Sequence, residues 1–176
     1  ATADQLPEAI EVALRYDRRV LVEERLAGME FSVIVLGNHG AEVLLPTQVI
    51  TTNPLMTYED KYMPGQSQKI TPPPVDAATL DRIQRAARDV YVSLGFRGYA
   101  RLDGFLCHDG RLLFVDPNST SGMAPSSFMF HQAAEAGLTP TALISRILDL
   151  ALEAHAQVKG PLGAPLPPRA PPAKGD

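Results

Sequence analysis

Apolar residues recur every three or four positions in four segments of the chain. That spacing places them along one side of a helix, and it predicts helices over residues 6–16, 75–94, 127–136 and 140–157. The residues at the ends of these segments agree, because Gly95 follows the second helix and Thr139 precedes the last. The segments between the helices follow a different pattern.

Short runs of β-branched and aromatic residues, bounded by glycine, proline and asparagine, fill those segments and predict strands. The loop Asn38-His39-Gly40 is typical of a hairpin, so neighbouring runs are expected to pair antiparallel. The pattern thus predicts an early meander with one buried face and a later hairpin. The predicted strands cover residues 19–25, 30–36, 42–50, 68–71, 99–107 and 111–116.

The later hairpin turns at Asp109-Gly110, the dipeptide favoured in two-residue type I′ loops. Such a loop determines the register, and side chains two residues apart share a face. His108 is then expected opposite Arg111, and three further cross-strand pairs are expected on one face of the ribbon: Phe105 with Phe114, Asp103 with Asp116 and Arg101 with Asn118.

Asp103 and Asp116 would repel each other across this hairpin, with Cβ atoms roughly 5 Å apart. A divalent cation would neutralise them, and carboxylate and amide oxygens are the ligands that Mg²⁺ takes together with waters and substrate phosphates. Arg101 could then meet an anion carried by the metal. In the alternative interpretation, the two carboxylates lie at a solvated rim and Arg101 pairs with one of them.

Composition limits the class of protein. The chain has 176 residues, of which 45% are hydrophobic, so residues 1–158 are expected to form one domain with a buried core. Residues 159–176 are rich in proline, glycine and alanine, which predicts a disordered tail. The net charge is −4 and the basic residues are scattered, which argues against a nucleic-acid partner. The single cysteine, Cys107, excludes an intrachain disulfide and fits a cytoplasmic location.

No run approaches the roughly 20 apolar residues of a membrane span, so no membrane partner is expected. Two polar loops stand out instead. One, 51–66, contains Tyr58-Glu59-Asp60-Lys61-Tyr62, and loops of that length are often functional. The other loop follows Asn118, is rich in serine, and leads into the predicted helix at 127–136. The N-terminus of that helix could bind an anion. In the alternative interpretation, a serine simply caps the helix.

The order of these motifs resembles the carboxy-terminal half of the D-alanine-D-alanine ligases, which belong to the ATP-grasp superfamily. The resemblance runs over about residues 7–157 and rests on VEERLAGMEF, YEDKY, GYARLD, DPN, the Ser/Gly loop and AAEAGLTPTALISRILDLAL. It implies an α+β fold, the ATP-grasp carboxy-terminal subdomain, with an antiparallel sheet, helices packed on one face and a nucleotide on the other.

The resemblance also implies roles for individual residues. ATP would be bound by Glu23 at the adenine amino group, the backbone of Leu26, Glu30 at the ribose, Lys61 on a closing loop, and an apolar floor of Phe105 and Phe114. Two Mg²⁺ ions would be held by Asp103, Asp116 and Asn118. Catalysis would use Arg101 and the backbone amide of Gly122, and the second amino acid would be contacted by Ser127, Phe128 and Tyr62.

The implied reaction joins two D-alanines for peptidoglycan: ATP phosphorylates the first carboxylate, and the amine of the second attacks the acyl phosphate. Asp116 stands where the family usually has glutamate, and Ser121-Gly122 replaces Pro-Gly, so a related amino-acid or depsipeptide ligase is an alternative. The family's amino-terminal domain and glycine-rich loop have no counterpart here, which predicts an inactive fragment. Because the family tends to dimerise, the resemblance also implies a homodimer. A non-catalytic nucleotide-binding module is a further alternative.

Overall fold

The computed structural model describes residues 2–51 and 67–157. The chain begins with η1 (Ala3–Gln5) and α1 (Leu6–Leu14), and it ends with α4 (Phe128–Glu135) and α5 (Pro140–Gln157). Between them lie β1 (Gly28–Leu36), β2 (Glu42–Val43), β3 (Thr47–Thr51), β4 (Ser67–Ile70), α3 (Ala77–Ser93), β5 (Tyr99–Cys107) and β6 (Leu112–Asn118). None of the helices in the described residues is long and apolar enough to cross a membrane.

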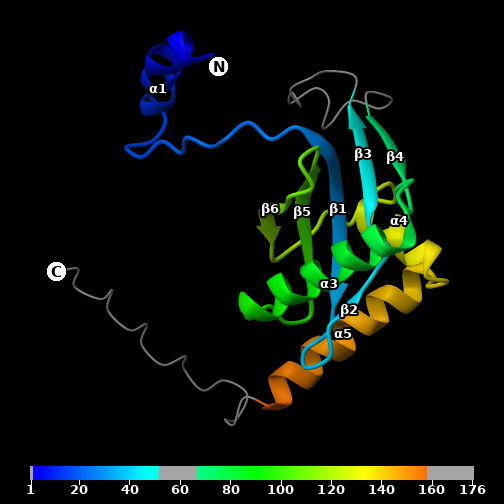
Figure 1. Ribbon diagram of the computed structural model, residues 1–176. Coiled ribbons are helices and arrows are strands. Elements are labelled where there is room, and N and C mark those ends of the chain that lie inside the picture. Colours follow the sequence, from blue (N-terminus) through cyan, green and yellow to red (C-terminus); the bar gives the residue numbers. More distant parts are fainter. Residues whose placement is uncertain (1, 52–66, 158–176) are drawn as a thin grey trace.

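The strands form one antiparallel sheet in the order β4-β3-β1-β5-β6, with β2 also paired to β1 (Figure 1). The pairing of β1 with β5 is the longest, running from Gly28 opposite Cys107 to Leu36 opposite Tyr99. The predicted α+β class and antiparallel sheet are therefore confirmed, as are helices at all four predicted segments, now bounded as α1, α3, α4 and α5.

Helices cover both faces of this sheet, whereas the sequence placed them on one. On β1, Phe31, Val33 and Val35 pack against α3, while Ile34 and Leu36 pack against α4 and α5. All five side chains are at most 1% exposed. The physical reason lies in the run FSVIVL, which has apolar residues at both alternating positions and so must bury both sides of the strand.

The coverage of the second face is incomplete, and this matters for the site. The α4 and α5 helices cover the end of β1 that contains Ile34 and Leu36. Toward the other end, Glu30 is only half-buried, and its cross-strand neighbour Phe105 is half-buried as well. One face of the sheet is thus closed by α3, and the opposite face is open at the Glu30 end of β1.

The predicted strand over residues 19–25 is absent. Residues 17–27 have neither helix nor strand, and α1 stands away from the sheet (Figure 1). A strand needs a hydrogen-bonding partner, and no described strand pairs with this segment. Its apolar side chains stay accessible, with Leu21 79% and Val22 58% exposed. Likewise the single strand predicted over 42–50 is divided into β2 and β3 at Leu44-Leu45-Pro46, where proline lacks a backbone donor.

Candidate functional site

The β5–β6 hairpin has a loop of three residues, not the predicted two. Cys107 lies opposite Arg111, whose carbonyl accepts a hydrogen bond from the Cys107 amide at 2.8 Å. Only Gly110 has a positive φ, +84°, so a type I′ turn is excluded. Next to the loop, Leu106 therefore pairs with Leu112 and Phe105 with Leu113, one residue away from the predicted register.

A β-bulge restores the register further along. Gly104 pairs with Phe114 but Asp103 pairs with Asp116, so Val115 is an extra residue. The predicted pairs Asp103 with Asp116 and Arg101 with Asn118 are confirmed. Gly104 was the signal for the irregularity, since glycine inside a strand often marks a bulge or a close approach. A Cβ at Gly104 would lie 2.5 Å from the Leu113 carbonyl oxygen and 2.8 Å from the Phe31 ring.

The three-residue loop places Phe114 on the opposite face from Phe105. The Phe114 ring meets the ring of Phe31 edge-on, with centroids 5.6 Å apart, in the core beneath α3. Phe105 stays on the face of Asp103 and lies between Glu30 and Leu113. The expectation that Phe105 and Phe114 share one face is wrong, because the longer loop shifts β6 by one residue and puts Leu113 opposite Phe105.

Arg101, Asp103, Asp116 and Asn118 form one cluster at the base of the hairpin. Arg101 Nε lies 3.1 Å from both carboxylate oxygens of Asp103, and Arg101 Nη2 lies 2.8 Å from Asp103 Oδ2. The same nitrogen is 3.9 Å from Asp116 Oδ2. The side chains of Arg101 and Asp103 are 24% and 21% exposed, whereas that of Asp116 is 63% exposed. Asn118 Nδ2 donates to the Asp116 carbonyl at 2.9 Å.

The cluster therefore matches the alternative interpretation in one respect: Arg101 pairs with a carboxylate. It also suits Mg²⁺ as the sequence argument requires, because Asp103, Asp116 and the amide oxygen of Asn118 are hard oxygen donors. Among the described residues, no three acidic, histidine or cysteine side chains gather into a metal site. The donor set thus fits a magnesium ion whose other ligands are waters and phosphate oxygens, and not a metal enclosed by protein alone.

A buried network holds Asp103 from behind, and the sequence argument missed it. Ser32 Oγ donates to Asp103 Oδ1 at 2.7 Å. Gln132 of α4 is fully buried; it donates to the Ser32 carbonyl at 2.8 Å and to Thr47 Oγ1 at 3.0 Å, and it accepts from the Ile34 amide at 2.9 Å. A glutamine on the apolar side of a predicted helix was the available signal. The network ties α4 to the strand that supports Asp103.

The residues expected around adenine are only partly brought together. Glu30 shares a face with Phe105. Glu23 and Leu26 lie in the irregular segment before β1, which runs beside the tip of the hairpin, where the His108 amide donates to the Ala27 carbonyl at 3.1 Å. Glu23 is exposed and Leu26 half-buried. Lys61 and Tyr62 lie outside the described residues.

Glu24, next to the expected Glu23, forms the ion pair of this segment. Arg111 binds it through two nitrogens, at 2.8 and 3.1 Å, and also binds Asp109 at 2.7 Å. The side-chain hydrogen bond from Arg111 lowers the pKa of Glu24. Hydrogen bonds from the backbone and side chain of Arg111 lower the pKa of Asp109. All three groups are exposed, so this second cluster lies in solvent at the hairpin tip.

The start of α4 forms the other border of the open face. Ser127 is its N-cap residue, and the Ser127 hydroxyl is buried and makes no hydrogen bond within the described structure. Ser121 has a similarly unpaired hydroxyl, and Gly122 beside it is exposed. The loop 119–127 thus presents unused polar groups, consistent with the expected substrate side.

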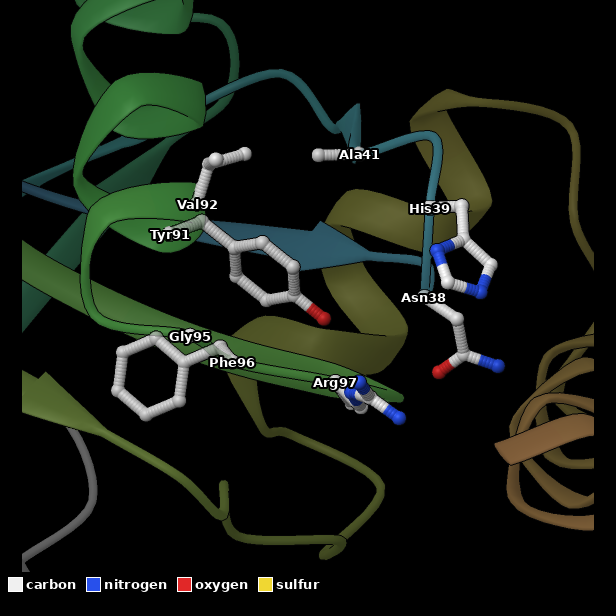
Figure 2. Close-up of a pocket in the computed structure, with 8 residues that line it drawn as sticks. All are labelled: Asn38, His39, Ala41, Tyr91, Val92, Gly95, Phe96 and Arg97. Carbon is white, nitrogen blue, oxygen red and sulfur yellow. The ribbon is translucent and has the colours of Figure 1, made fainter. Parts of the chain in front are cut away.

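The hollow drawn in Figure 2 is a separate feature, with a volume of about 310 Å³ at the end of α3. The rings of Tyr91 and Phe96 lie on one side, and Asn38 and His39 on the other (Figure 2). Tyr91 donates to the Gly37 carbonyl at 2.6 Å, and burial raises the pKa of Tyr91 to about 12. Asn38 is bonded to Leu150 and Gly98. Because these polar groups are satisfied and Tyr91 lies on the α3 face, the hollow is not part of the site.

Comparisons with known proteins agree with this architecture. The family model described as D-ala D-ala ligase C-terminus matches residues 1–149. A D-alanine–D-alanine ligase of Desulforamulus reducens is 36% identical over 150 residues, which are 85% of this chain and 48% of the relative. The chain therefore spans about half the length of the curated relatives that it matches.

Solved structures show the same fold. The VanG D-Ala:D-Ser ligase of Enterococcus faecalis aligns with a TM-score of 0.72 and 28% identity, over 84% of this chain and 43% of that one. The D-alanine–D-alanine ligase of Bacillus anthracis complexed with ATP aligns with a TM-score of 0.72 and 22% identity, over 87% of this chain and 49% of that one.

Proposed function

Since this chain belongs to the D-alanine-D-alanine ligase carboxy-terminal family, we propose that it is the carboxy-terminal part of an ATP-dependent ligase. That enzyme would join two D-alanines through an acyl phosphate. The observation that carries the proposal is the cluster of Arg101, Asp103, Asp116 and Asn118, paired across β5 and β6 as the reaction requires. It lies on the face that the helices leave partly open.

Nucleotide would lie along this open face. Phe105 and Leu113 would contact the adenine, with Glu23 at its amino group, the backbone of Leu26 on its edge and Glu30 at the ribose hydroxyls. Asp103, Asp116 and Asn118 would hold two Mg²⁺ ions at the phosphates, where the metal supplies charge neutralisation during phosphoryl transfer. Asp116 is one methylene shorter than glutamate, but its 63% exposure leaves it accessible from solvent.

Arg101 would stabilise the phosphoryl group during its transfer to the first D-alanine carboxylate. Because its guanidinium already spans Asp103 and approaches Asp116, its position is determined before substrate binds. The amine of the second D-alanine would attack the acyl phosphate, and the Gly122 amide would donate to the resulting oxyanion. Ser127, Phe128 and Tyr62 would bind the second D-alanine. Lys61 and Tyr62, on a closing loop, would keep water from the acyl phosphate.

About half of each matched relative has no counterpart in this chain. We propose that a preceding segment of the same protein supplies the glycine-rich phosphate loop and the site of the first D-alanine. The exposed Leu21 and Val22 would offer such a segment apolar surface to pack against. Residues 2–157 alone would then contain half of the site, bind nucleotide weakly and make no dipeptide.

A second substrate has support from one comparison, because the VanG protein is named a D-Ala:D-Ser ligase and aligns over 84% of this chain. The departures lie close together in the sequence, at Asp116 on β6 and at Ser121-Gly122 in the loop that follows it. A panel of D-serine, D-lactate and D-alanine as the second substrate would distinguish these possibilities.

The deciding experiment measures Mg-ATP-dependent phosphate release and dipeptide formation with D-alanine, for this chain and for its full reading frame side by side. Activity in the longer protein alone is the expected result. Dipeptide synthesis by this chain alone would contradict the half-site proposal. Tight Mg-ATP binding by this chain, with no activity in either protein on any amino or hydroxy acid, would favour a nucleotide-binding module.

A further inference from the structure

Lys69 is a half-buried cation that the proposed reaction does not yet use. It lies on β4 opposite Val49, and Val49 is itself opposite Glu30, so all three side chains share the open face of the sheet. The Lys69 ammonium donates to the Ser126 carbonyl at 3.0 Å and lies 4.5 Å from the centroid of the Phe128 ring. It therefore lies next to Ser127, the N-cap residue of α4.

No carboxylate within the described residues pairs with Lys69. Among the described residues, Ser126 accepts from one of its three donors, and the other two have no acceptor there. Burial lowers the pKa of Lys69, which is consistent with an ammonium that lacks an anion beside it. The adjacent hydroxyl of Ser127 is buried and also lacks a partner.

A cation with spare donors, an unpaired hydroxyl and a helix N-terminus all favour a carboxylate at this place. We infer that Lys69 is a further positioning residue, which meets the carboxylate of the second substrate beside Ser127. The inference rests on the proposed ligase function. If the inference holds, Lys69 makes the enzyme prefer a second substrate with a free carboxylate. This preference applies whether the nucleophile of that substrate is an amine or a hydroxyl.

The test compares two acceptors in the full reading frame: D-alanine, and D-alaninamide, in which a neutral amide replaces the carboxylate. Lys69→Met removes the charge and keeps an unbranched side chain, and Lys69→Arg keeps the charge. Arg85→Met is the matched control, because Arg85 is an exposed cation on α3, on the other face of the sheet.

Lys69→Met is expected to reduce the preference for D-alanine over D-alaninamide, measured as the ratio of kcat/KM values, by about tenfold, the scale of one charged hydrogen bond. The loss should appear in KM for the acceptor, with KM for ATP unchanged, and Lys69→Arg and Arg85→Met should retain the preference. An equal loss for both acceptors would assign Lys69 a merely structural role and overturn the inference alone. A wild-type protein that ligates neither acceptor would overturn the proposed function and this inference together.

Discussion

The β5–β6 hairpin has two clusters that each combine one arginine with two carboxylates, and their ion pairs differ in burial. At the tip, Arg111 binds Glu24 and Asp109, and these side chains are 48%, 61% and 53% exposed. At the base, Arg101 binds Asp103 with 24% and 21% of the side chains exposed, while the second carboxylate, Asp116, is 63% exposed. Exposed ion pairs are screened by water and salt. Burial, not residue type, therefore distinguishes the Arg101–Asp103 pair from the pairs at the tip.

The support behind each cluster also differs. Asp103 is held by Ser32, which is linked to α4 through the buried Gln132. The tip cluster is bonded to the irregular segment before β1 through Glu24, and Arg82 of α3 donates to the Gly110 carbonyl in the same loop. Preorganised charges stabilise a developing charge better than mobile ones. The buried network behind Asp103 is the kind of support that the proposed phosphoryl transfer would need, and within the described residues the exposed tip cluster has no such buried network.

The largest expected difference is in catalysis. Arg101→Ala in the full reading frame should lower dipeptide synthesis by about a thousandfold or more, because an arginine at a transferring phosphoryl group contributes on that scale. Arg111→Ala should leave the rate within about twofold. Steady-state kinetics at saturating Mg-ATP measure both, and circular dichroism verifies folding. Equal effects of the two substitutions would remove the functional distinction between the clusters.

The next effect is on the support of the base cluster. Gln132→Ala leaves the Ile34 amide and the Ser32 carbonyl without their partner in the core. Each unsatisfied buried group costs about 1–3 kcal/mol, so we expect a loss of about 3 kcal/mol in the free energy of unfolding, measured by urea denaturation of this chain. Gln84→Ala is the control, because Gln84 bonds carbonyls from a half-buried position. A loss no larger than that of the control would contradict the role of the network.

Substitutions of Phe114 and Phe105 are expected to have different effects, one on core packing and the other on the proposed nucleotide site. Phe114→Ala should destabilise the chain by about 2 kcal/mol, since the ring packs on Phe31 but is only partly buried. Phe105→Ala should destabilise it less and instead weaken nucleotide binding by the full reading frame. Thermal unfolding and ATP titration measure the two effects. The reverse assignment would contradict the register that the three-residue loop gives these two rings.

The smallest effect concerns pH at the hairpin tip. Arg111 lowers the pKa of Glu24 and of Asp109 in the folded state, so their pairing stabilises the fold above the unfolded pKa values and is lost as the pH falls through the folded ones. Arg111→Ala should return both pKa values toward their ordinary range, followed by carboxyl NMR titration. Unchanged titration curves would show that the pairs do not form in solution.

Local patterns were sufficient for much of this molecule. Helical periodicity predicted α3, α4 and α5, and the strand runs predicted β5 over residues 99–107, because short-range spacing determines these elements. The pairing of Asp103 with Asp116 was predicted correctly, but the two-residue loop from which it was derived is wrong. The three-residue loop shifts the register by one residue, and the bulge at Val115 shifts it back. Two unrecognised irregularities cancelled.

Tertiary structure decided the rest, wherever an outcome depends on a distant partner. The segment 19–25 has strand propensity but finds no neighbouring strand, so it stays irregular. The apolar run on β1 is compatible with one or two covering layers, and only the packing of α3 on one face of the sheet and of α4 and α5 on the other determines that there are two. Asp103, Gln132 and Lys69 acquire contacts from strands and helices far apart in the chain. Residue spacing therefore determines which side chains share a face, and long-range packing determines which of them are buried, paired and able to act.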